Sequence, residues 1–474
     1  MVDYLFTFQI HGDSIMSAVS TASANKKFHI AKFGGTSVAN FKTMYKSADI
    51  VIANKNVRIV VLSASSGITN LLIKLTETCN DNRRKALLKQ IRQHQYTIIN
   101  CLDNPFSIQP IIDHLLARLT ALSAVTTQQP LTAPHIDEIV SYGELMSSYL
   151  FVEILRQRGV IATWFDVRNI MQTNDKFGKA EPNQQQLKRL ANKYLLPKLQ
   201  ENLIVTQGFI GQDEAGRTTT LGRGGSDYTA ALIAEALSFD QVDIWTDVAG
   251  IYTTDPRIVA SAKSISAITF NEAAEMAVFG AKILHSATLL PAIRAGIPVF
   301  VGSSQIPEKS GTYICASTKK LPQFRALTIR RKQTLLTLHS LNMLPARGFL
   351  AEVFTLLSQH HISVDLITTS EVSIALTLDT TGSTTTKRNL LTDTLMTELA
   401  KLCRVDVEEG LALVAIIGNN LSQIDGLGSH IFSALATHNI RMICYGASSH
   451  NICLLVSDKE AETIIQILHK NLFE

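Results

Sequence analysis

The feature that most constrains this chain is a glycine-rich decapeptide at residues 221–230 (LGRGGSDYTA), which runs directly into an apolar helical pattern. Three of the residues 222–225 are glycine, and glycine permits positive φ angles and close backbone approach. Ser226 or Asp227 can cap the helix that follows, whose free N–H groups and dipole favour an anion. Arg223 adds a permanent charge on a fork that suits a carboxylate or a phosphate. The segment predicts an anion site, and a tight strand-to-helix turn with a surface arginine is the alternative.

The decapeptide matches neither standard nucleotide-binding fingerprint. The chain contains no G-x-x-x-x-G-K-[ST] segment, which argues against a P-loop enzyme. A G-x-G-x-x-G spacing would need glycine at position 227, where the chain has aspartate. A Rossmann dinucleotide site is therefore not predicted here.

Composition describes an ordinary soluble globular protein. The 474 residues leave room for two to four domains, and 46% hydrophobic with 18% charged residues leave little extended disorder. A net charge of +4 without a dense basic run excludes nucleic acid as the main ligand. No apolar stretch approaches the ~18 to 20 residues of a membrane helix, so no membrane association is expected. The six cysteines are scattered without C-x-x-C, which favours reduced thiols in a cytoplasmic protein.

Residues 1–26 differ from the rest of the chain. They include acidic residues, lack a basic n-region and end in a Ser/Ala/Thr-rich stretch, which makes a poor secretory signal. We expect a mobile N-terminal extension, with Met16 a plausible natural start.

A βαβ unit follows this extension. Residues 28–33 (FHIAKF) and 57–63 (VRIVVLS) have the pattern of buried strands, and Ser37 can cap the helix between them. This order predicts a parallel sheet covered on both faces. Lys32 precedes Gly34 and Gly35 closely enough for its ammonium to reach a phosphate held by the loop amides, and a solvated surface lysine is the alternative.

Two further segments contain candidate site residues. A helical stretch contains residues 141–147 (SYGELMS), where Gly143 marks a close approach because glycine costs about 1 kcal/mol in a helix. In that stretch alone, Glu144 has the pattern of an ordinary solvent-facing carboxylate. The strand at 242–247 leads into the loop 248–257, whose composition is typical of a ligand rim at a sheet's carboxyl edge. Tyr252 can stack on a base there, and an ordinary polar turn is the alternative.

The C-terminal part contains an internal repeat. The segment from Leu335 matches the segment from Leu413, 78 residues later, and the same spacing pairs Gly348 with Gly426. Each copy has the pattern strand, loop, helix, strand, turn, strand. Such units are too small to bury both sheet faces alone, so we expect them to pack on each other or on another subunit.

Together these segments resemble the aspartate kinases, and most closely the lysine-sensitive, monofunctional aspartokinases of bacteria. The resemblance covers about residues 28–474. It rests on five motifs in family order: Lys32-Phe-Gly-Gly-Thr-Ser, Ser141-Tyr-Gly-Glu-Leu, Leu221-Gly-Arg-Gly-Gly-Ser-Asp, Trp245-Thr-Asp-Val and Phe279-Gly-Ala-Lys.

The resemblance implies an α/β fold, with an amino acid kinase domain of mostly parallel sheet flanked by helices, followed by two ACT (βαββ) modules. We expect the extension at 1–26, the catalytic domain at 27–320, and the modules at 326–404 and 405–474, where the last strand pairs back with the first. The implied reaction converts ATP and L-aspartate into ADP and 4-phospho-L-aspartate, the first step towards lysine, threonine, methionine and diaminopimelate.

The resemblance also implies residue roles. The catalytic residues are Lys32, Asp227 and Arg223. The aspartate site consists of Thr69, Glu144, Arg223 and Ser226. The ATP side consists of Lys32, Gly34, Gly35, Thr246, Asp247, Tyr252, Arg257 and Lys282. Mg²⁺ is expected on phosphate oxygens and water, without a protein metal cage.

For the first ACT module the resemblance implies that L-lysine binds and inhibits. The residues implied are Met343, Phe349, Leu350, Ser363, Val364, Asp365, Thr369, Ser370 and Glu371. One departure is Pro345-Ala346, where lysine-sensitive relatives carry His-Ser; losing a hydroxyl contact costs about 1 kcal/mol. A second is His285-Ser286 in place of His-Pro at a helix start. Neither alters the proposed chemistry.

The expected assembly is a homodimer through the ACT modules that associates further, to a tetramer, with lysine. One competing interpretation is another amino acid kinase, acting on glutamate, acetylglutamate or a nucleoside monophosphate. A non-enzymatic amino acid sensor is a second, and it would tolerate loss of Lys32, Arg223 and Asp227, which are all present.

Overall fold

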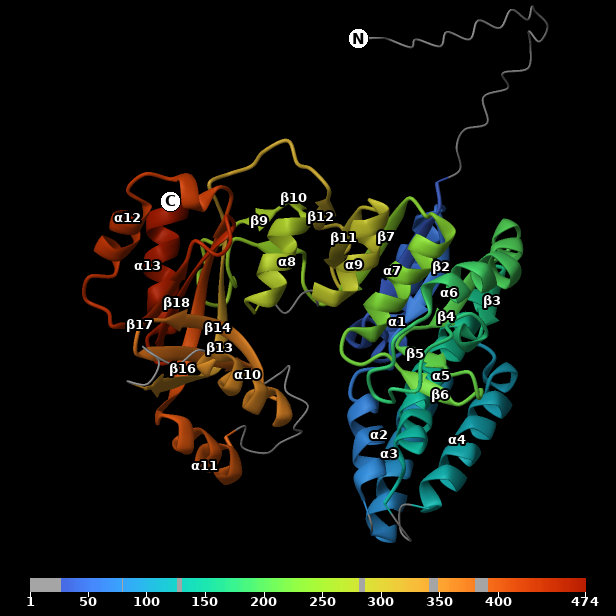
Figure 1. Ribbon diagram of the computed structural model, residues 1–474. Coiled ribbons are helices and arrows are strands. Elements are labelled where there is room, and N and C mark those ends of the chain that lie inside the picture. The colour runs from blue at the N-terminus through green and yellow to red at the C-terminus, as the bar shows by residue number, and fades with distance from the viewer. Residues whose placement is uncertain (1–26, 79, 126–129, 281–285, 341–347, 380–390) are drawn as a thin grey trace, which may run out of the picture.

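The computed structural model describes residues 27–78, 80–125, 130–280, 286–340, 348–379 and 391–474. The expected extension at 1–26 therefore lies outside the described residues. Figure 1 shows two units side by side, an N-terminal α/β unit and a C-terminal unit, with helix α8 between them. No helix in the described ranges is long and apolar enough to cross a bilayer.

The N-terminal unit is built on an eight-stranded sheet of order β10-β12-β11-β7-β1-β2-β4-β3. Neighbouring strands are parallel except for the β11–β12 pair. The strands are β1 (His29–Phe33), β2 (Val57–Leu62), β3 (Ala162–Phe165), β4 (Leu203–Gln207), β7 (Gln241–Thr246), β10 (Ala267–Thr269), β11 (Val299–Ser303) and β12 (Thr312–Cys315). Two hairpins flank it: β5 (Ile210–Gln212) with β6 (Thr218–Thr220), and β8 (Ile251–Tyr252) with β9 (Ser264–Ile265).

Helices cover both faces of this sheet, as the βαβ pattern predicts. They are α1 (Phe41–Ala53), α2 (Ile68–Glu77), α3 (Asp81–Ile99), α4 (Gln109–Ala124), α5 (Ala133–Gln157), α6 (Gln184–Leu190), α7 (Gly225–Leu237), α8 (Phe270–Val278) and α9 (Ser286–Ala295). Successive strand residues point to opposite faces of the sheet and so belong to two separate cores. Ile30 lies in the core on the face that α7 covers, and Ala31 lies in the core on the face that α5 covers. The strands are buried on both faces, which accounts for their continuous apolar sequences.

The start of α1 differs from the prediction. Asn40, and not Ser37, caps this helix, through a reciprocal capping box with Thr43. Ser37 lies in a short 3₁₀ turn, where its buried hydroxyl contacts the hydroxyl of Ser304 at 2.6 Å. The Ser37 hydroxyl, which the local sequence predicts as the cap of α1, is instead in contact with Ser304 in the loop after β11.

The C-terminal unit is a six-stranded sheet of order β14-β15-β13-β16-β18-β17. Its elements are β13 (Phe324–His339), α10 (Phe349–Gln359), β14 (Ser363–Thr369), β15 (Ser373–Asp379), α11 (Asp393–Leu402), β16 (Arg404–Gly418), α12 (Leu427–Ala434), β17 (Ile440–Tyr445), β18 (Asn451–Ser457) and α13 (Ala461–Phe473). Helices α10 and α12, and strands β15 and β18, begin 78 residues apart, which confirms the predicted repeat.

The two repeats share their longest strands. The first half of β13 pairs with the second half of β16, and the second half of β13 pairs with the first half of β16. A bulge follows Arg330, and Lys332 and Gly410 adopt positive φ where the two strands bend. Each four-stranded half thus borrows a strand segment from the other repeat. The module limits at 404 and 405 remain a prediction.

Helix α8 joins the two units. Glu272 pairs with Arg325 at 2.7 Å and accepts from Asn419 at 2.6 Å, while Glu275 accepts from Ser448 and Asn451. These carboxylates are three residues apart and lie on one face of the helix. Helix α8 is therefore held against the C-terminal unit by its first and second turns.

Candidate active site

Three loops meet at the carboxyl edge of the central strands. The Gly34 amide donates to the Trp245 carbonyl at 3.0 Å, and the Ser66 amide donates to the Gly35 carbonyl at 3.0 Å. A Cβ on Gly35 would lie 2.8 Å from the Ala64 carbonyl oxygen. The glycine pair after β1 is thus pressed between the loops after β2 and β7, where a side chain does not fit.

Lys32 and Asp227 form an ion pair at this edge. Lys32 lies near the end of β1, Asp227 lies in the first turn of α7, and Nζ is 2.5 Å from Oδ1. Both side chains are nearly buried, at 10% and 14% exposed. A Cβ on Gly34 would lie 3.7 Å from Nζ, so the ammonium lies beside the glycine loop. The arrangement places a cation within reach of a group held by the loop amides.

The start of α7 corrects the predicted cap. Gly224, with φ 74°, is the N-cap residue, and no side chain caps the helix. Ser226 and Asp227 lie inside the first turn instead. Ser226 is buried against Gly208, where an added Cβ would lie 2.5 Å from Ser226 Cβ. Because Gly224, in the left-handed conformation, is the N-cap, the helix begins earlier than it would with Ser226 or Asp227 as the cap. No side chain of the described residues accepts from the N–H groups of the first turn, so these groups can bind an anion.

Arg223 is exposed on the decapeptide turn. Within the described ranges no carboxylate pairs with it. Its charge thus stands at the open end of α7, beside a helix dipole that also favours an anion. The turn has the charge that the sequence predicts for a carboxylate or phosphate site.

Glu144 is buried, so its expected solvent-facing position is wrong. The residue is 4% exposed on α5, and its Oε1 accepts from the Ala64 amide at 3.1 Å. Among the described residues, Oε2 has no hydrogen-bond partner. Burial raises the pKa of Glu144 to about 8, against the opposing effects of the Ala64 amide and the Lys32 charge. A buried carboxylate with one unsatisfied oxygen suits a cationic ligand group.

Gly143 explains how α5 comes so close. A Cβ at this position would lie 2.6 Å from Ala64 Cβ, which confirms the close approach predicted from the sequence. Ser65, in the same loop, has a hydroxyl that is buried and without a partner among the described residues. Sequence analysis missed Ser65; its signal was the small-residue turn directly after a buried strand. Thr69, in the first turn of α2, is half-buried.

Four of the residues predicted for the ATP side lie at the end of β7 and in the segment that follows it. Thr246 ends β7 and donates to Asp247 at 3.1 Å, and Tyr252 is half-buried in β8. Arg257 is exposed and pairs with Asp255 at 2.6 Å, which, together with the Asp247 charge, raises the pKa of Arg257. Lys282 lies outside the described residues.

The predicted lysine-binding residues gather on α10 and β14. Phe349 is buried and Leu350 is exposed at the start of α10, while Ser363, Val364, Asp365 and Thr369 lie on β14. Ser370 and Glu371 form the exposed turn that follows β14. Asp365 pairs with Arg330 of β13 at 3.0 Å, a contact that the sequence did not predict. Met343, Pro345-Ala346 and His285 lie outside the described residues.

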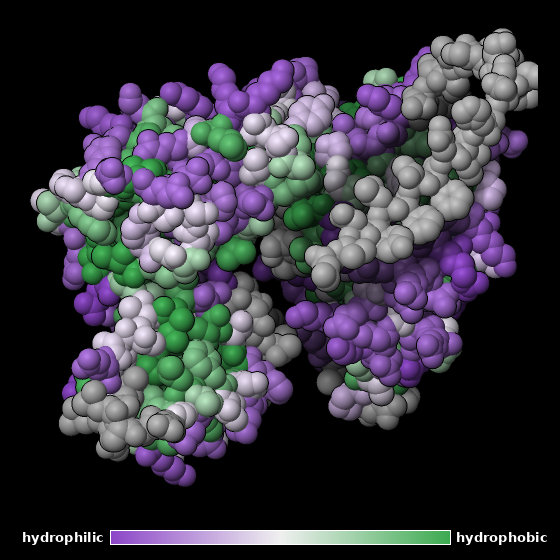
Figure 2. All heavy atoms as spheres, turned by 45° about the horizontal axis from the view of Figure 1, so that its top comes forward, coloured by the Kyte–Doolittle hydropathy of each residue, from purple (hydrophilic) through white to green (hydrophobic). Residues whose placement is uncertain are grey.

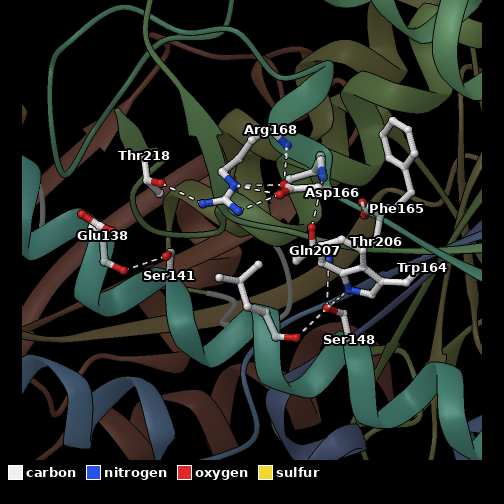
Figure 3. Close-up of polar contacts among 12 residues, drawn as sticks. Glu138, Ser141, Ser148, Trp164, Phe165, Asp166, Arg168, Thr206, Gln207 and Thr218 are labelled. Atoms are coloured by element: carbon white, nitrogen blue, oxygen red, sulfur yellow. Dashed lines mark hydrogen bonds and ion pairs between the residues drawn. The ribbon is translucent and has the colours of Figure 1, made fainter. Parts of the chain in front are cut away.

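A cavity of about 240 Å³ opens on another face of α5, next to Tyr142 and Tyr149. Figure 3 shows Arg168 and Asp166 pairing with each other there, and Trp164 donating to Ser148. These charges are satisfied within the cavity wall. Among the described residues this cavity lining has no buried polar side-chain atom without a partner, whereas Ser65 and Glu144, on the other side of α5, have one each, which makes that side the candidate site.

The fold and site define a small-molecule kinase of the amino acid kinase class. Residues 27–303 match the amino acid kinase family, and residues 414–472 match the ACT domain. Lysine-sensitive aspartokinase 3 of Escherichia coli is 62% identical, over 94% of this chain and 99% of its own length. Aspartokinase 1, chloroplastic, of Arabidopsis thaliana is 34% identical, over 94% and 80%. The chain belongs to the aspartokinase family.

Solved structures agree with this assignment. The crystal structure of E. coli aspartokinase III in complex with aspartate and ADP (R-state) has a TM-score of 0.87. The structure of that enzyme in complex with lysine and aspartate (T-state) has a TM-score of 0.82. Each is 61% identical, and the match covers 94% of this chain and all of the other.

Proposed function

We propose that this chain is an aspartate kinase that transfers the γ-phosphoryl group of ATP to the side-chain carboxylate of L-aspartate, and that L-lysine inhibits it through the first ACT module. The observation that carries the proposal is the Lys32–Asp227 pair beside the glycine loop, with a buried Glu144 close enough for the Lys32 charge to lower its pKa. The family membership of the chain supports the same reaction.

Phosphoryl transfer here needs no protein base. The aspartate carboxylate is already ionised at neutral pH; its oxygen forms the new bond to the γ-phosphorus as the bond to the ADP oxygen breaks. Catalysis then depends on alignment and charge neutralisation. In our proposal Lys32 and the amide of Gly35 neutralise the moving phosphoryl group, and Asp227 orients Lys32. Gly34, whose own amide donates to the Trp245 carbonyl, keeps the loop close to that group.

The acceptor amino acid has three charges to satisfy. Arg223, with Ser226 and the N-terminus of α7, suits a carboxylate, and the unsatisfied oxygen of Glu144 suits the ammonium. Thr69 lies at the start of α2, directly after the loop that contains Ala64. On the nucleotide side we assign Thr246, Asp247, Tyr252, Arg257 and Lys282 as the sequence predicts, and Arg257 must leave Asp255 to reach a phosphate.

Mg²⁺ is proposed as the companion of ATP. Within the described residues no three His, Cys, Asp or Glu side chains gather to hold a metal ion. In this proposal Mg²⁺ is carried on phosphate oxygens and water, which is how it commonly binds with nucleotides. There it would neutralise phosphate charge that the lysine and the amides do not reach.

We also propose that the chain forms a homodimer through its ACT modules. Figure 2 shows hydrophobic side chains gathered on part of the C-terminal unit. The exposed apolar residues of this unit include Leu350, Phe354, Ile367 and Val407. Exposed apolar surface of this kind favours a protein partner. Sedimentation at micromolar concentration should give a dimer, and a tetramer with lysine; a monomer under both conditions would contradict the proposal.

The function is tested by a hydroxamate assay with Mg-ATP. Aspartate should yield the hydroxamate, and millimolar lysine should suppress it. Glutamate and acetylglutamate serve as competing acceptors, since preferred use of either would assign the chain to another amino acid kinase. Lysine binding without phosphoryl transfer to any acceptor would instead make it a sensor.

The pKa of Glu144 predicts a pH dependence for aspartate binding. A folded-state pKa of about 8, above its usual value, means that the ligand-free site holds a proton at neutral pH. The substrate ammonium favours the ionised carboxylate, so binding should release this proton, and the KM for aspartate should fall as pH rises from 6.5 to 8.5. Calorimetry in buffers of different ionisation enthalpy measures the release.

The same shift acts on stability, with a defined sign. Between the unfolded pKa and about pH 8 the folded ligand-free protein binds more protons than the unfolded chain, so this group makes stability fall as pH rises through that window. Glu144→Gln should remove this fall and flatten the KM profile at a higher KM. A variant that keeps the wild-type profile would show that another group titrates.

A further inference from the structure

Arg330 links the predicted lysine site to helix α8. Its Nη1 is 3.0 Å from Asp365 Oδ2, and both side chains are only about 15% exposed. The same Nη1 donates to the carbonyl of Val278, the last residue of α8, at 3.4 Å. One guanidinium thus contacts a carboxylate predicted to bind lysine and the end of the helix that joins the two units.

The residues that follow α8 pack closely against β13, the strand that contains Arg330. Gly280 has φ 108°, and a Cβ there would lie 2.5 Å from the Ile329 carbonyl oxygen and 3.2 Å from Arg330 Cβ. Phe279 is buried in an apolar cluster with Leu335 and Leu366 of the C-terminal sheet. Lys282, predicted to contact ATP, follows two residues later in the sequence and lies outside the described residues.

Asp365 is therefore already paired with a cation in this structure. A partly buried carboxylate cannot make its best contacts with Arg330 and with an ammonium of lysine at the same time. Lysine would have to displace the guanidinium, which then no longer ties β14 to the end of α8. An effector changes activity only by its difference in affinity between two arrangements, and this exchange supplies such a difference.

We propose that Arg330 is a positioning residue that competes with lysine for Asp365 and transmits lysine binding to the ATP side of the site. This inference rests on the proposed lysine regulation and adds to it the residue that couples the two sites. Arg330 touches neither the substrate nor the phosphoryl group in this account; it acts through Val278 and Gly280.

The neighbouring Arg331 provides a matched control. It lies on the same strand, but its guanidinium pairs with Asp458, at 3.0 Å, and with Glu462 of α13. Arg331→Gln removes the same charge from the same strand without touching Asp365 or α8. Its lysine affinity and its inhibition should equal those of the wild type.

The test compares lysine binding with lysine inhibition in the full-length protein. Arg330→Gln should bind lysine about fivefold more tightly in titration calorimetry, because the internal competitor is gone. It should also raise the KM for ATP without lysine, with little change in kcat, and lose most of the further rise in that KM that lysine causes. Arg330→Lys keeps one cation and should restore part of both properties, which a purely structural defect would not show.

Weaker or unchanged lysine binding by Arg330→Gln, with inhibition intact, would overturn the inference while leaving lysine regulation in place. A wild-type chain that binds no lysine would overturn the regulation itself and the inference with it. If Arg330→Gln does not fold, Arg330→Lys decides the question: partly reduced coupling with tighter lysine binding at native thermal stability supports the exchange, and full coupling at wild-type affinity refutes it.

Discussion

Replacing Lys32 by methionine is expected to lower kcat by at least about 10³-fold, because the moving phosphoryl group loses a nearly buried cation. The effect should fall on kcat more than on the KM for aspartate, since Glu144 and Arg223 remain. Initial rates in the hydroxamate assay measure it. Lysine binding, which depends on the other unit, should be unchanged by calorimetry.

Loss of folding must be separated from loss of chemistry in this variant. Lys32→Met leaves Asp227 nearly buried and unpaired, at a cost on the order of 3 kcal/mol in the free energy of unfolding. Lys32→Met with Asp227→Asn should recover most of that stability and none of the activity. Lys46→Met is the control, because among the described residues this lysine donates only to the Gln305 carbonyl. If Lys32→Met alone keeps more than a tenth of the wild-type kcat, Lys32 does not neutralise the phosphoryl group and the proposed mechanism is wrong on this point.

Asp365→Ala is expected to give an active enzyme that responds to lysine far more weakly than the wild type. A hydrogen-bonded ion pair with the effector contributes roughly 1.5–3 kcal/mol, so half-inhibition should need about 10- to 100-fold more lysine. Turnover without lysine should persist, because Asp365 lies on β14, in the C-terminal unit and outside the catalytic site. Lysine titration at fixed Mg-ATP and aspartate measures the shift.

Asp406→Ala is the matched control for Asp365. This carboxylate lies on β16 of the same sheet and pairs with Arg404 and His339 on the exposed surface. Its removal should leave the lysine response unchanged. If Asp365→Ala responds to lysine as the wild type does, the effector site must lie elsewhere on the C-terminal unit.

Local pattern predicted much of the framework. The buried strands around Lys32, the decapeptide turn and the repeat of 78 residues each depend on neighbouring residues, and the structure contains all three. The family assignment made from the five motifs is confirmed by the comparisons. Short-range signals sufficed where backbone conformation and burial follow from the adjacent sequence.

Predictions of local contacts failed where a distant segment competed for the same group. Ser37 was expected to cap α1, but its hydroxyl contacts Ser304, 267 residues away. Ser226 or Asp227 was expected to cap α7, but Asp227 pairs with Lys32 of β1. In both cases a buried tertiary partner outweighs a local hydrogen bond of about 1 kcal/mol.

The sequence alone determined which groups this chain can use: glycine turns that admit an anion, a lysine and an arginine beside them, and a duplicated βαββ unit. Only the tertiary structure decided their environment. Glu144 is buried because Gly143 lets α5 press against Ala64, about 80 residues earlier, and Asp365 is occupied because β13 brings Arg330 beside it. Charge and hydrogen-bonding capacity belong to the residue, but desolvation and pairing depend on packing between segments far apart in the chain.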